Sequence, residues 1–335
     1  MAQQRDNASN QRELVSQFLT ADEMQSSPPL VKGPIFRGEL SKVFYAETSS
    51  CPYSLAVKLC ISERTGRPNP ADATEQFQAL QTIAPLMPKN EPYAVPQPFK
   101  LDAPNGLIAI EWIDGRTLTS YLKEYRFPMD KLLELIERAG IWLQHYHAIR
   151  AEPTATLDAT KQYQEFAANV AASPLRADRT FMRANLEIDR QVESITEQTF
   201  PRALLHGDFK TDNLMLSGDR IVGMDIQARH KNLVLWDIVP FLNRIGLFLY
   251  SPHGLRLLRR RHEIEQRFLT GYFARELSAQ ESAAIAWLRL LILLQQWDDR
   301  HISMANNRLK RAVNDWTYRR EANWLTRSLA RAAPR

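Results

Sequence analysis

The chain has 335 residues, of which 44% are hydrophobic and 24% are charged, and its formal net charge is +5. This is enough apolar material for a sizeable core in one two-lobed domain or in two domains. The charge excess is mild, so it accommodates an anionic ligand such as a nucleotide, and we expect no nucleic-acid partner.

The first ten residues are polar and lack the basic-then-apolar order of a signal peptide. The longest apolar stretch, residues 290–294, is far shorter than the ~20 residues that cross a bilayer. The two cysteines, Cys51 and Cys60, have no nearby histidines in a metal-binding pattern. We therefore expect a cytoplasmic protein without stable membrane insertion, and its oligomeric state stays open.

Residues 1–29 form a polar lead that is either disordered or contains one short helix over 13–19. From residue 30 the pattern changes to short runs rich in β-branched and aromatic residues, which is typical of strands. Three strands and one helix are expected in this part: 43–46, 54–59, 72–82 (the helix) and 107–112. This pattern predicts a small α+β lobe over 30–111, followed by a hinge at 112–115.

After residue 115 the pattern is mostly helical, with wide amphipathic stripes. The expected helices are 130–149, 156–171, 178–196, 252–277 and 280–299. Short strands around a charged loop interrupt them at 203–205, 214–216 and 221–225. The sequence therefore predicts an α+β fold whose second, helical lobe covers 116–335, with a ligand-binding cleft where the two lobes join.

The segment HGDFKTDN over residues 206–213 is the strongest indication of chemistry. Phosphoryl transfer needs a positioned hydroxyl and divalent metal rather than covalent help from the protein. Asp208 is suited to accept the hydroxyl proton, and Asn213 and Asp225 supply the oxygen ligands that magnesium favours. Each residue alone also suits a polar turn between strands, but the full spacing favours a catalytic site.

Lys58 lies within an apolar strand, LAVKL, where a charge is costly unless it meets an anion. In the kinase pattern V-A-I-K, such a lysine pairs with the ATP phosphates and with a glutamate of the next helix. Glu75 is the candidate partner, and Asp72 and Glu63 are alternatives. An edge strand with Lys58 in water remains the structural alternative.

The H-G-D-x-x-x-x-N pattern, with the apolar strand and the aspartate after it, resembles the catalytic loop of the aminoglycoside phosphotransferase and choline kinase superfamily. The resemblance covers about residues 33–245. It implies a two-lobed protein-kinase-like fold, with a small β-rich N-lobe and a larger, mostly helical C-lobe, that uses ATP and Mg²⁺. It also implies that Asp208 is the catalytic base, that Asn213 and Asp225 bind magnesium, and that His206 braces the loop.

Other residues match the superfamily pattern less closely. Lys210 takes the position of a lysine that meets the transferred phosphate, although a solvated loop lysine is the alternative. Gly38 and Ser41 lie where a loop covers the phosphates, without the full G-x-G-x-x-G pattern. The sequence IEWIDG resembles the hinge, which implies that the backbone at Glu111 and Ile113 holds adenine, while a core role for Ile113 remains open.

Departures from the protein-kinase pattern favour a small acceptor. Gly207 replaces an arginine that many protein kinases use to hold a phosphorylated loop. The segment from Asp225 to Asp237 is short, which leaves little room for a peptide platform, and the resemblance implies that Asp237 braces the loop. The expected function is phosphorylation of a small-molecule hydroxyl. A pseudokinase that acts as regulator or scaffold is the alternative, and these departures disfavour a protein kinase.

Two features bear on the acceptor. The sequence QWDD at 296–299 places an aromatic beside two carboxylates, which suits a cationic amine, or it is a solvated helix end. Residues 307–335 are rich in arginine with interleaved aromatics, which suits an anionic substrate, a membrane surface, or a packed surface helix. Because these features favour opposite charges, the acceptor is left unassigned.

Overall fold

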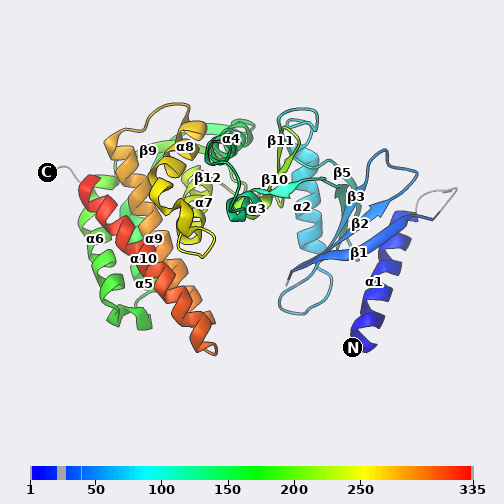
Figure 1. Ribbon diagram of the computed structural model, residues 1–335, viewed down its shortest axis with the longest axis horizontal. Coiled ribbons are helices and arrows are strands. Elements are labelled where there is room, and N and C mark those ends of the chain that lie inside the picture. The colour runs from blue at the N-terminus through cyan, green and yellow to red at the C-terminus, as the bar shows by residue number, and fades with distance from the viewer. Residues whose placement is uncertain (1, 21–27, 39, 333–335) are drawn as a thin grey trace. The chain divides into compact units, whose positions relative to one another are not determined.

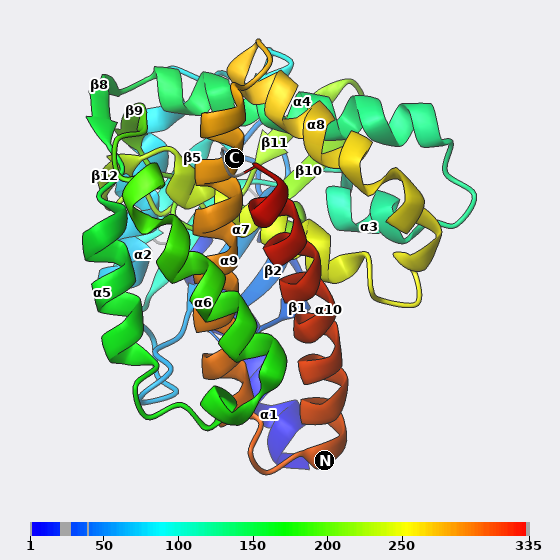
Figure 2. The ribbon, with the colours of Figure 1, turned by 90° about the vertical axis from the view of Figure 1, so that its left-hand side faces the viewer.

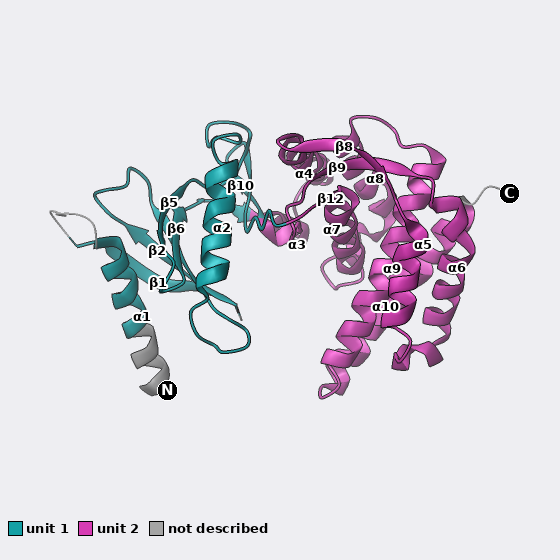
Figure 3. Ribbon diagram, turned by 180° about the vertical axis from the view of Figure 1, so that it is seen from behind, with its two compact units in different colours: residues 1–116, 214–229 teal, residues 117–213, 230–335 magenta. Residues whose placement is uncertain are grey.

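The computed structural model describes residues 2–20, 28–38 and 40–332 (Figure 1). The chain forms two compact units (Figure 3): Met1–Arg116 with Leu214–Arg229, and Thr117–Asn213 with His230–Arg335. Each unit is built from two separate stretches of chain, so the chain passes between the units three times. Within the described part of the chain, no helix is long and apolar enough to cross a lipid bilayer.

A five-stranded sheet forms the centre of the first unit, with strand order β1-β2-β3-β6-β5. Its strands are β1 (Leu30–Arg37), β2 (Ser41–Glu47), β3 (Leu55–Cys60), β6 (Leu107–Glu111) and β5 (Pro98–Asp102). Every neighbouring pair is antiparallel. The strand expected at 43–46 is longer, and β1 and β5 were not expected from the sequence.

Alternation along β3 determines which face of the sheet Lys58 occupies. One face forms an apolar core that includes the buried side chains of Phe18, Phe44, Leu55, Val57 and Leu59. Phe18 belongs to α1 (Ala2–Thr20), which is longer than the helix expected over 13–19. Lys58 lies on the opposite face, beside Cys60, which packs against α2 (Pro70–Ile83).

Helix α2 begins with a side-chain cap, because Asn69 accepts a hydrogen bond from the Asp72 backbone N–H at 3.3 Å. Its buried side chains are Ala73, Phe77, Ala79, Leu80 and Ile83. Their spacing of three and four residues places them on one face against the sheet. Asp72 and Gln76 are four residues apart and share the adjoining face, so both point toward the same part of the sheet.

A smaller sheet with the order β4-β11-β10-β7 completes the first unit. Its strands are β4 (Tyr93–Ala94), β11 (Arg220–Gly223), β10 (Leu214–Ser217) and β7 (Arg116–Thr117). Strands β10 and β11 form a hairpin, and Val222 of β11 packs with Ala94 and Ile113 in a small core. A Cβ on Gly115 would lie 2.3 Å from the carbonyl oxygen of Leu216, so this close backbone approach requires glycine.

The second unit is mostly helical (Figure 2). Its α-helices are α3 (Leu118–Lys123), α4 (Met129–Ala148), α5 (Ala159–Asn169), α6 (Arg179–Ile195), α7 (Leu235–Phe248), α8 (Arg261–Phe273), α9 (Ala279–Ser303) and α10 (Arg308–Ala332). Its 3-10 turns are η1 (Pro174–Ala177), η2 (Thr211–Asn213) and η3 (Leu255–Arg260). A sheet with the order β12-β9-β8 contains β12 (Lys231–Leu233), β9 (Thr199–Leu204) and β8 (Ala151–Thr156).

Close helix packing holds the second unit together. Helices α6, α9 and α10 lie along one another (Figure 2). Between α4 and α8, a Cβ on Gly140 would lie 2.2 Å from the Phe268 carbonyl oxygen, and a Cβ on Gly271 would lie 2.2 Å from the Glu137 carbonyl oxygen. The two backbones therefore approach each other because both helices carry glycine at the crossing.

A buried ion-pair cluster joins α8, α9 and α10. Arg261 Nη2 lies 2.6 Å from Glu321 Oε1, and Arg289 Nη1 lies 3.0 Å from Glu265 Oε2. The guanidinium of Arg261 also stacks on the Trp324 ring, 3.2 Å from its centroid. The arginine-rich tail is therefore a packed helix whose aromatic residues contact the rest of the unit.

Two expected helices differ in the structure. The helix expected at 252–277 divides into η3 and α8, and a Cβ on Gly254 would lie 2.0 Å from the Phe248 carbonyl oxygen. The helix expected at 156–171 begins at Ala159, because the residues before it form β8 and pair with β9. In both places tertiary contacts override the local helical pattern.

Candidate active site

A buried aspartate braces the HGDFKTDN segment, which lies between β9 and β10. Asp237 of α7 is 1% exposed, and its Oδ2 accepts a hydrogen bond from the His206 backbone N–H at 2.6 Å. Its Oδ1 accepts one from the Gly207 backbone N–H at 3.0 Å, and His147 Nε2 lies 3.0 Å from Oδ2. The carboxylate thus fixes the two residues that directly precede Asp208.

The groups around Asp237 stabilise its charged form. Burial alone would raise the pKa of Asp237, but hydrogen bonding to His147 and to the Gly207 N–H lowers that pKa below its ordinary value. The Tyr272 hydroxyl lies 2.8 Å from Nδ1 of His147 and fixes the ring from its other side. Gly207 has a φ of 86°, which strains any other residue, so an arginine at this position is disfavoured.

His206 supports the loop from beneath. Its side chain is fully buried, and Nδ1 accepts a hydrogen bond from the Asp208 backbone N–H at 3.3 Å. Its ring packs against the rings of Trp142, Tyr146 and Phe209. This burial and packing suit the bracing role expected for His206.

Three polar side chains of the loop are in direct contact. Asp208 Oδ2 accepts hydrogen bonds from Lys210 Nζ at 2.5 Å and from Asn213 Nδ2 at 3.0 Å. Asn213 Nδ2 also donates to the Asp208 carbonyl oxygen at 2.9 Å. Because the Asn213 amide nitrogen faces Asp208 twice, the amide oxygen is directed away from Asp208.

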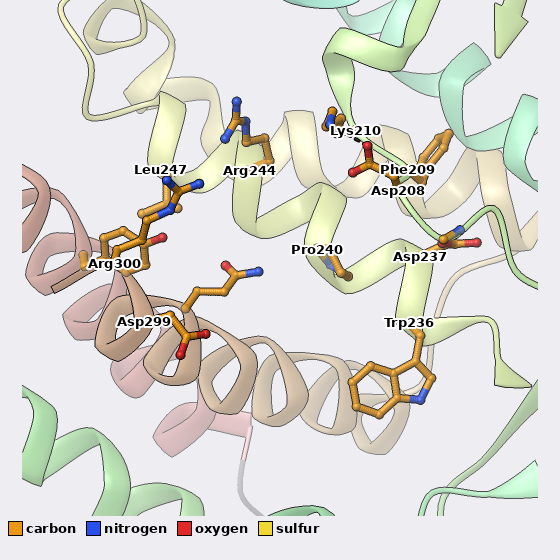
Figure 4. Close-up of a pocket in the computed structure, with 13 residues that line it drawn as sticks. Asp208, Phe209, Lys210, Trp236, Asp237, Pro240, Arg244, Leu247, Asp299 and Arg300 are labelled. Atoms are coloured by element: carbon orange, nitrogen blue, oxygen red, sulfur yellow. Dashed lines mark hydrogen bonds and ion pairs between the residues drawn. The ribbon is translucent and has the colours of Figure 1, made fainter. Parts of the chain in front are cut away.

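Asp208 and Lys210 line a cavity of about 270 Å³, whose walls all belong to the second unit (Figure 4). The other walls come from α7, α9 and α10. Their polar or aromatic lining side chains include Trp236, Arg244, Gln296, Asp299, Arg300 and Tyr318. The cavity therefore combines the expected catalytic base with charged and aromatic groups from three helices.

The QWDD sequence contributes only partly to this cavity. Gln296 and Asp299 line it, whereas Trp297 and Asp298 are buried in the core. The Trp297 indole N–H donates to an aspartate of α10, and Asp298 accepts a hydrogen bond from Ser173. Neither alternative for QWDD, an amine site or a solvated helix end, describes all four residues, because a helix turns by ~100° per residue and separates the two pairs.

In the first unit, Lys58 pairs with Asp225. Lys58 Nζ lies 2.6 Å from Asp225 Oδ1 and donates to Gln76 Oε1 at 2.8 Å. Burial alone would lower the pKa of Lys58, but the charge of Asp225 raises it above its ordinary value. Asp225 has a φ of 55°, an uncommon conformation for a residue other than glycine that often marks functional positions.

Glu75 does not take the expected place beside Lys58. Its Oε2 lies 2.6 Å from Arg229 Nε, and Arg229 Nη2 also lies 2.9 Å from Asp72 Oδ1. Gln76, one position further along α2, faces Lys58 and donates from Nε2 to Asp72 Oδ2 at 2.9 Å. Adjacent helix residues point about 100° apart, so only one of the two can face the strand.

The remaining predicted nucleotide residues also lie in the first unit. The Gly38 N–H donates to the Ser41 carbonyl oxygen at 2.8 Å and closes the β1–β2 turn, in which Glu39 lies outside the described residues. Glu111 is buried at the end of β6. The side chain of Ile113 belongs to the core, and no other described residue hydrogen-bonds to its backbone N–H or C=O.

The expected metal ligands fit magnesium by their chemistry. Asn213 and Asp225 offer an amide oxygen and a carboxylate, which are hard oxygen ligands. Among the residues that the structure describes, no three His, Cys, Asp or Glu side chains gather in a way that could hold a metal ion. Magnesium at nucleotide sites typically needs only one or two protein oxygens, since phosphates and water complete its coordination.

Several residues of these networks were not found from the sequence: Gln76, Arg229, Arg244, Arg300 and Tyr318. For Gln76 the sequence held one indication. The apolar positions 73, 77 and 80 of α2 predict which side of the helix faces the sheet, and so which of its polar residues lie next to that side. No comparable pattern marks the arginines of α7 and α9.

Several solved structures of kinases resemble this chain. A choline/ethanolamine kinase family protein from Mesorhizobium loti is 16% identical, covers 97% of this chain and 98% of its own, and gives a TM-score of 0.61. Amicoumacin kinase in complex with AMP-PNP, Ca²⁺ and Ami is 13% identical, with 87% of both chains covered and a TM-score of 0.56. Glucosamine kinase in complex with glucosamine, ADP and inorganic phosphate is 13% identical, with 96% and 99% covered and a TM-score of 0.51.

At these identities the similarity shows the fold, and it confirms the predicted α+β, protein-kinase-like fold class. No curated protein matches the chain. The model of a phosphotransferase enzyme family matches residues 34–224, which is more than half of the chain. This match confirms both the resemblance predicted from the HGDFKTDN segment and the prediction of a phosphotransferase enzyme. The chain belongs to the phosphotransferase enzyme family.

Proposed function

We propose that this enzyme transfers the terminal phosphoryl group of ATP to a hydroxyl of a small molecule and depends on Mg²⁺. The observation that carries the proposal is the braced loop, which presents Asp208 and Lys210 to a cavity. In the reaction the bond between the γ-phosphorus and the bridging oxygen breaks, and ADP leaves. A new bond forms between that phosphorus and the acceptor oxygen, and the hydroxyl proton passes to Asp208.

Asp208 and Lys210 have different roles at the acceptor hydroxyl. Asp208, as a carboxylate, orients the hydroxyl and accepts its proton, as a general base must. The Lys210 ammonium, 2.5 Å from that carboxylate, stabilises negative charge on the phosphoryl oxygens as the bond forms. Both side chains are about one-third exposed, so a substrate can reach them.

Residues of the first unit bind the nucleotide in this proposal. Lys58 holds the phosphates, which replace part of its contact with Asp225, and the turn from Gly38 to Ser41 covers them. The backbone of Glu111 and Ile113 receives the adenine. The nucleotide lobe then covers 30–111, the hinge 112–115, and the acceptor lobe 116–335.

Asn213 and Asp225 hold magnesium in this proposal. The ion neutralises charge on the phosphates when it is bound. Gln76 rather than Glu75 positions Lys58, and because Gln76 is neutral, the charge of Lys58 is balanced mainly by Asp225. This arrangement ties the lysine directly to one of the two expected metal ligands.

A small acceptor suits the residues that follow Asp225. The segment from Asp225 to Asp237 is short, and its strand β12 pairs with β9, which leaves little chain for a peptide platform. The cavity is near the lower limit of ~300 Å³ that is typical of small-molecule sites. We place the reaction in the cytoplasm, where ATP is available, and both cysteines are free and buried.

The test measures magnesium-dependent ADP formation with a panel of hydroxylated metabolites, for the wild type and for Asp208→Asn. We expect one acceptor class to stimulate turnover, and kcat to fall about 100- to 10,000-fold in the variant, because it loses the base. Asp219→Asn, which removes an exposed carboxylate in the β10–β11 turn, is the matched control and should keep wild-type turnover.

Calorimetric titration with Mg-ATP separates binding from chemistry. Asp208→Asn should bind Mg-ATP as the wild type does, since Asp208 acts on the acceptor. Wild-type turnover in Asp208→Asn contradicts the proposed mechanism. Binding of Mg-ATP without any turnover assigns the chain to the pseudokinase class, and absence of Mg-ATP binding contradicts the proposal as a whole.

A further inference from the structure

The charges of the cavity beside Asp208 indicate which kind of acceptor it can hold. The cavity is formed by the second unit alone, and Figure 4 shows Asp208 with Lys210, and Arg244 with Arg300, at the same cavity. The inference below rests on the proposed function, since it treats this cavity as the acceptor site.

Two of the carboxylates at the cavity are already compensated. Asp208 has Lys210 Nζ at 2.5 Å and the Asn213 amide at 3.0 Å. Asp237 is buried and hydrogen-bonded to two backbone N–H groups and to His147. A cationic acceptor therefore finds only Asp299 as an uncompensated carboxylate among the described residues that line the cavity.

The charges of the two arginines that line the cavity, Arg244 and Arg300, are balanced much less by ion pairs. Arg244 has one contact with Asp212, at 3.4 Å, and both side chains are largely exposed, so this pair is weak. No described residue forms an ion pair with Arg300. The cavity is therefore lined by two guanidinium groups with little competition for their charge and by one uncompensated carboxylate.

Tyr318 lines the same cavity as Arg244 and Arg300. Burial raises the pKa of Tyr318, while the charges of Arg300 and Arg244 act in the opposite direction and outweigh the effect of Asp299. The hydroxyl of this buried tyrosine therefore lies in the field of both arginines. A planar guanidinium fork matches the oxygens of a carboxylate or phosphate, and a tyrosine hydroxyl supplies a further donor.

We propose that the acceptor carries an anionic group, a carboxylate or a phosphate, which Arg244 and Arg300 bind while its hydroxyl faces Asp208. Trp236, Pro240 and Leu247 also line the cavity and offer apolar surface to the carbon skeleton of the acceptor. The cavity volume of about 270 Å³ suits a compact hydroxy acid or sugar acid rather than a molecule of several rings.

The test uses matched acceptors that differ in one charge. One set is D-glucuronate, D-glucose and D-glucosamine, and the other is glycerate, glycerol and serinol, with glycerol phosphate added to separate phosphate from carboxylate. Binding is measured by calorimetry at low ionic strength, on protein saturated with magnesium and a non-hydrolysable ATP analogue. We expect the anionic member of a set to bind most tightly, and added salt to weaken that binding.

Variants assign the preference to the arginines. Arg300→Gln and Arg244→Gln should each weaken binding of the anionic probe about 10- to 100-fold, the range expected for a charged hydrogen bond. Each should raise KM for an anionic acceptor and leave KM for ATP unchanged. Arg327→Gln, which removes an exposed arginine of α10 outside the cavity, should change neither. Arg300→Glu should shift the preference toward the ammonium-bearing member of each set.

The proposal is wrong if no anionic probe binds better than its neutral counterpart. It is also wrong if Arg244→Gln and Arg300→Gln bind anions as well as Arg327→Gln does. A third contrary result is that these two variants raise KM for ATP and leave KM for the acceptor unchanged. The last result assigns the arginines to the nucleotide phosphates. Titration of the same proteins with Mg-ATP, in the absence of the analogue, keeps the two proposals apart. If the wild type does not bind Mg-ATP, the proposed function is wrong. If it binds Mg-ATP but shows no preference for anionic probes, only the proposed acceptor class is wrong.

Discussion

Asp237→Asn tests whether the buried carboxylate holds the HGDFKTDN loop in place. The carboxylate accepts contacts from three groups, the backbone N–H of His206, the backbone N–H of Gly207, and His147 Nε2. Asparagine has nearly the same shape, but one of its two terminal atoms is a donor. If its oxygen serves His206 and His147, its nitrogen faces the Gly207 N–H, and two donors meet.

The expected loss in the free energy of unfolding follows from these contacts. Hydrogen bonds to a charged group contribute about 1.5–3 kcal/mol each, and the substitution removes one and converts two to neutral hydrogen bonds of about half that strength. We therefore expect Asp237→Asn to lower the free energy of unfolding by about 3–6 kcal/mol. Displacement of Asp208 by about 1 Å would also lower kcat about 100-fold.

The assays are urea denaturation, steady-state kinetics and amide hydrogen exchange at Gly207. Asp298→Asn is the matched control, because Asp298 is equally buried in the same unit but bonds to Ser173 rather than to the loop. It should lose stability without the fall in kcat or the faster exchange at Gly207. An Asp237→Asn protein with unchanged kcat, and with stability within about 0.5 kcal/mol of the wild type, refutes the brace.

Three further predictions concern other parts of the chain. Lys58→Met removes the ammonium that pairs with Asp225, so calorimetry should show Mg-ATP affinity lowered about 10- to 100-fold, and unchanged affinity contradicts its role. Gly246→Ala would place a Cβ 2.2 Å from Glu321 Oε1, displacing a carboxylate of the buried ion-pair cluster. We expect a loss of about 3–5 kcal/mol in urea denaturation, and a loss below about 1 kcal/mol means that the cluster adapts. The Arg275 hydrogen bond lowers the pKa of Glu281 from 4.5 to about 2, so its contribution to stability is complete above pH 4.5 and is lost as the pH falls toward 2. The difference in unfolding free energy between wild type and Glu281→Gln should therefore shrink over this range, and a constant difference contradicts the assignment.

The HGDFKTDN loop was predictable because the pattern that marks it lies within one short segment. The proposed chemistry needs Asp208 and Asn213 at a fixed spacing within one loop, and the apolar strand after them marks where the loop ends. The bracing role expected for Asp237 depends on a contact across 31 residues, from His206 to α7, which the resemblance supplied and the residues alone did not.

Helix rotation limited the prediction around Lys58. The sequence places Glu75 and Gln76 next to each other, and the charge of Glu75 made it the natural partner of a buried lysine. The structure turns Gln76 toward Lys58 because the apolar residues of α2 fix its rotation, and Glu75 then meets Arg229. Arg229 follows β11, and no local pattern in the sequence joins it to α2.

The cavity beside Asp208 was the least predictable part. Arg244 lies on α7, Arg300 on α9 and Tyr318 on α10, so their proximity depends on how three helices pack. The amphipathic pattern of each helix predicts a buried face, but it does not predict which ends meet. For the same reason QWDD was interpreted as one exposed group, although Gln296 and Asp299 line the cavity while Trp297 and Asp298 are buried in the core.

The β10–β11 hairpin prevents the first unit from serving as a portable module. A fragment that stops at Arg116 lacks β11, so β4 loses its parallel partner, and Ala94 and Ile113 lose their contact with Val222. Such a truncation exposes apolar surface and invites aggregation. Grafting this unit onto another enzyme therefore requires a redesigned connection that carries residues 214–229 along, for example a short linker that joins Arg116 to Leu214.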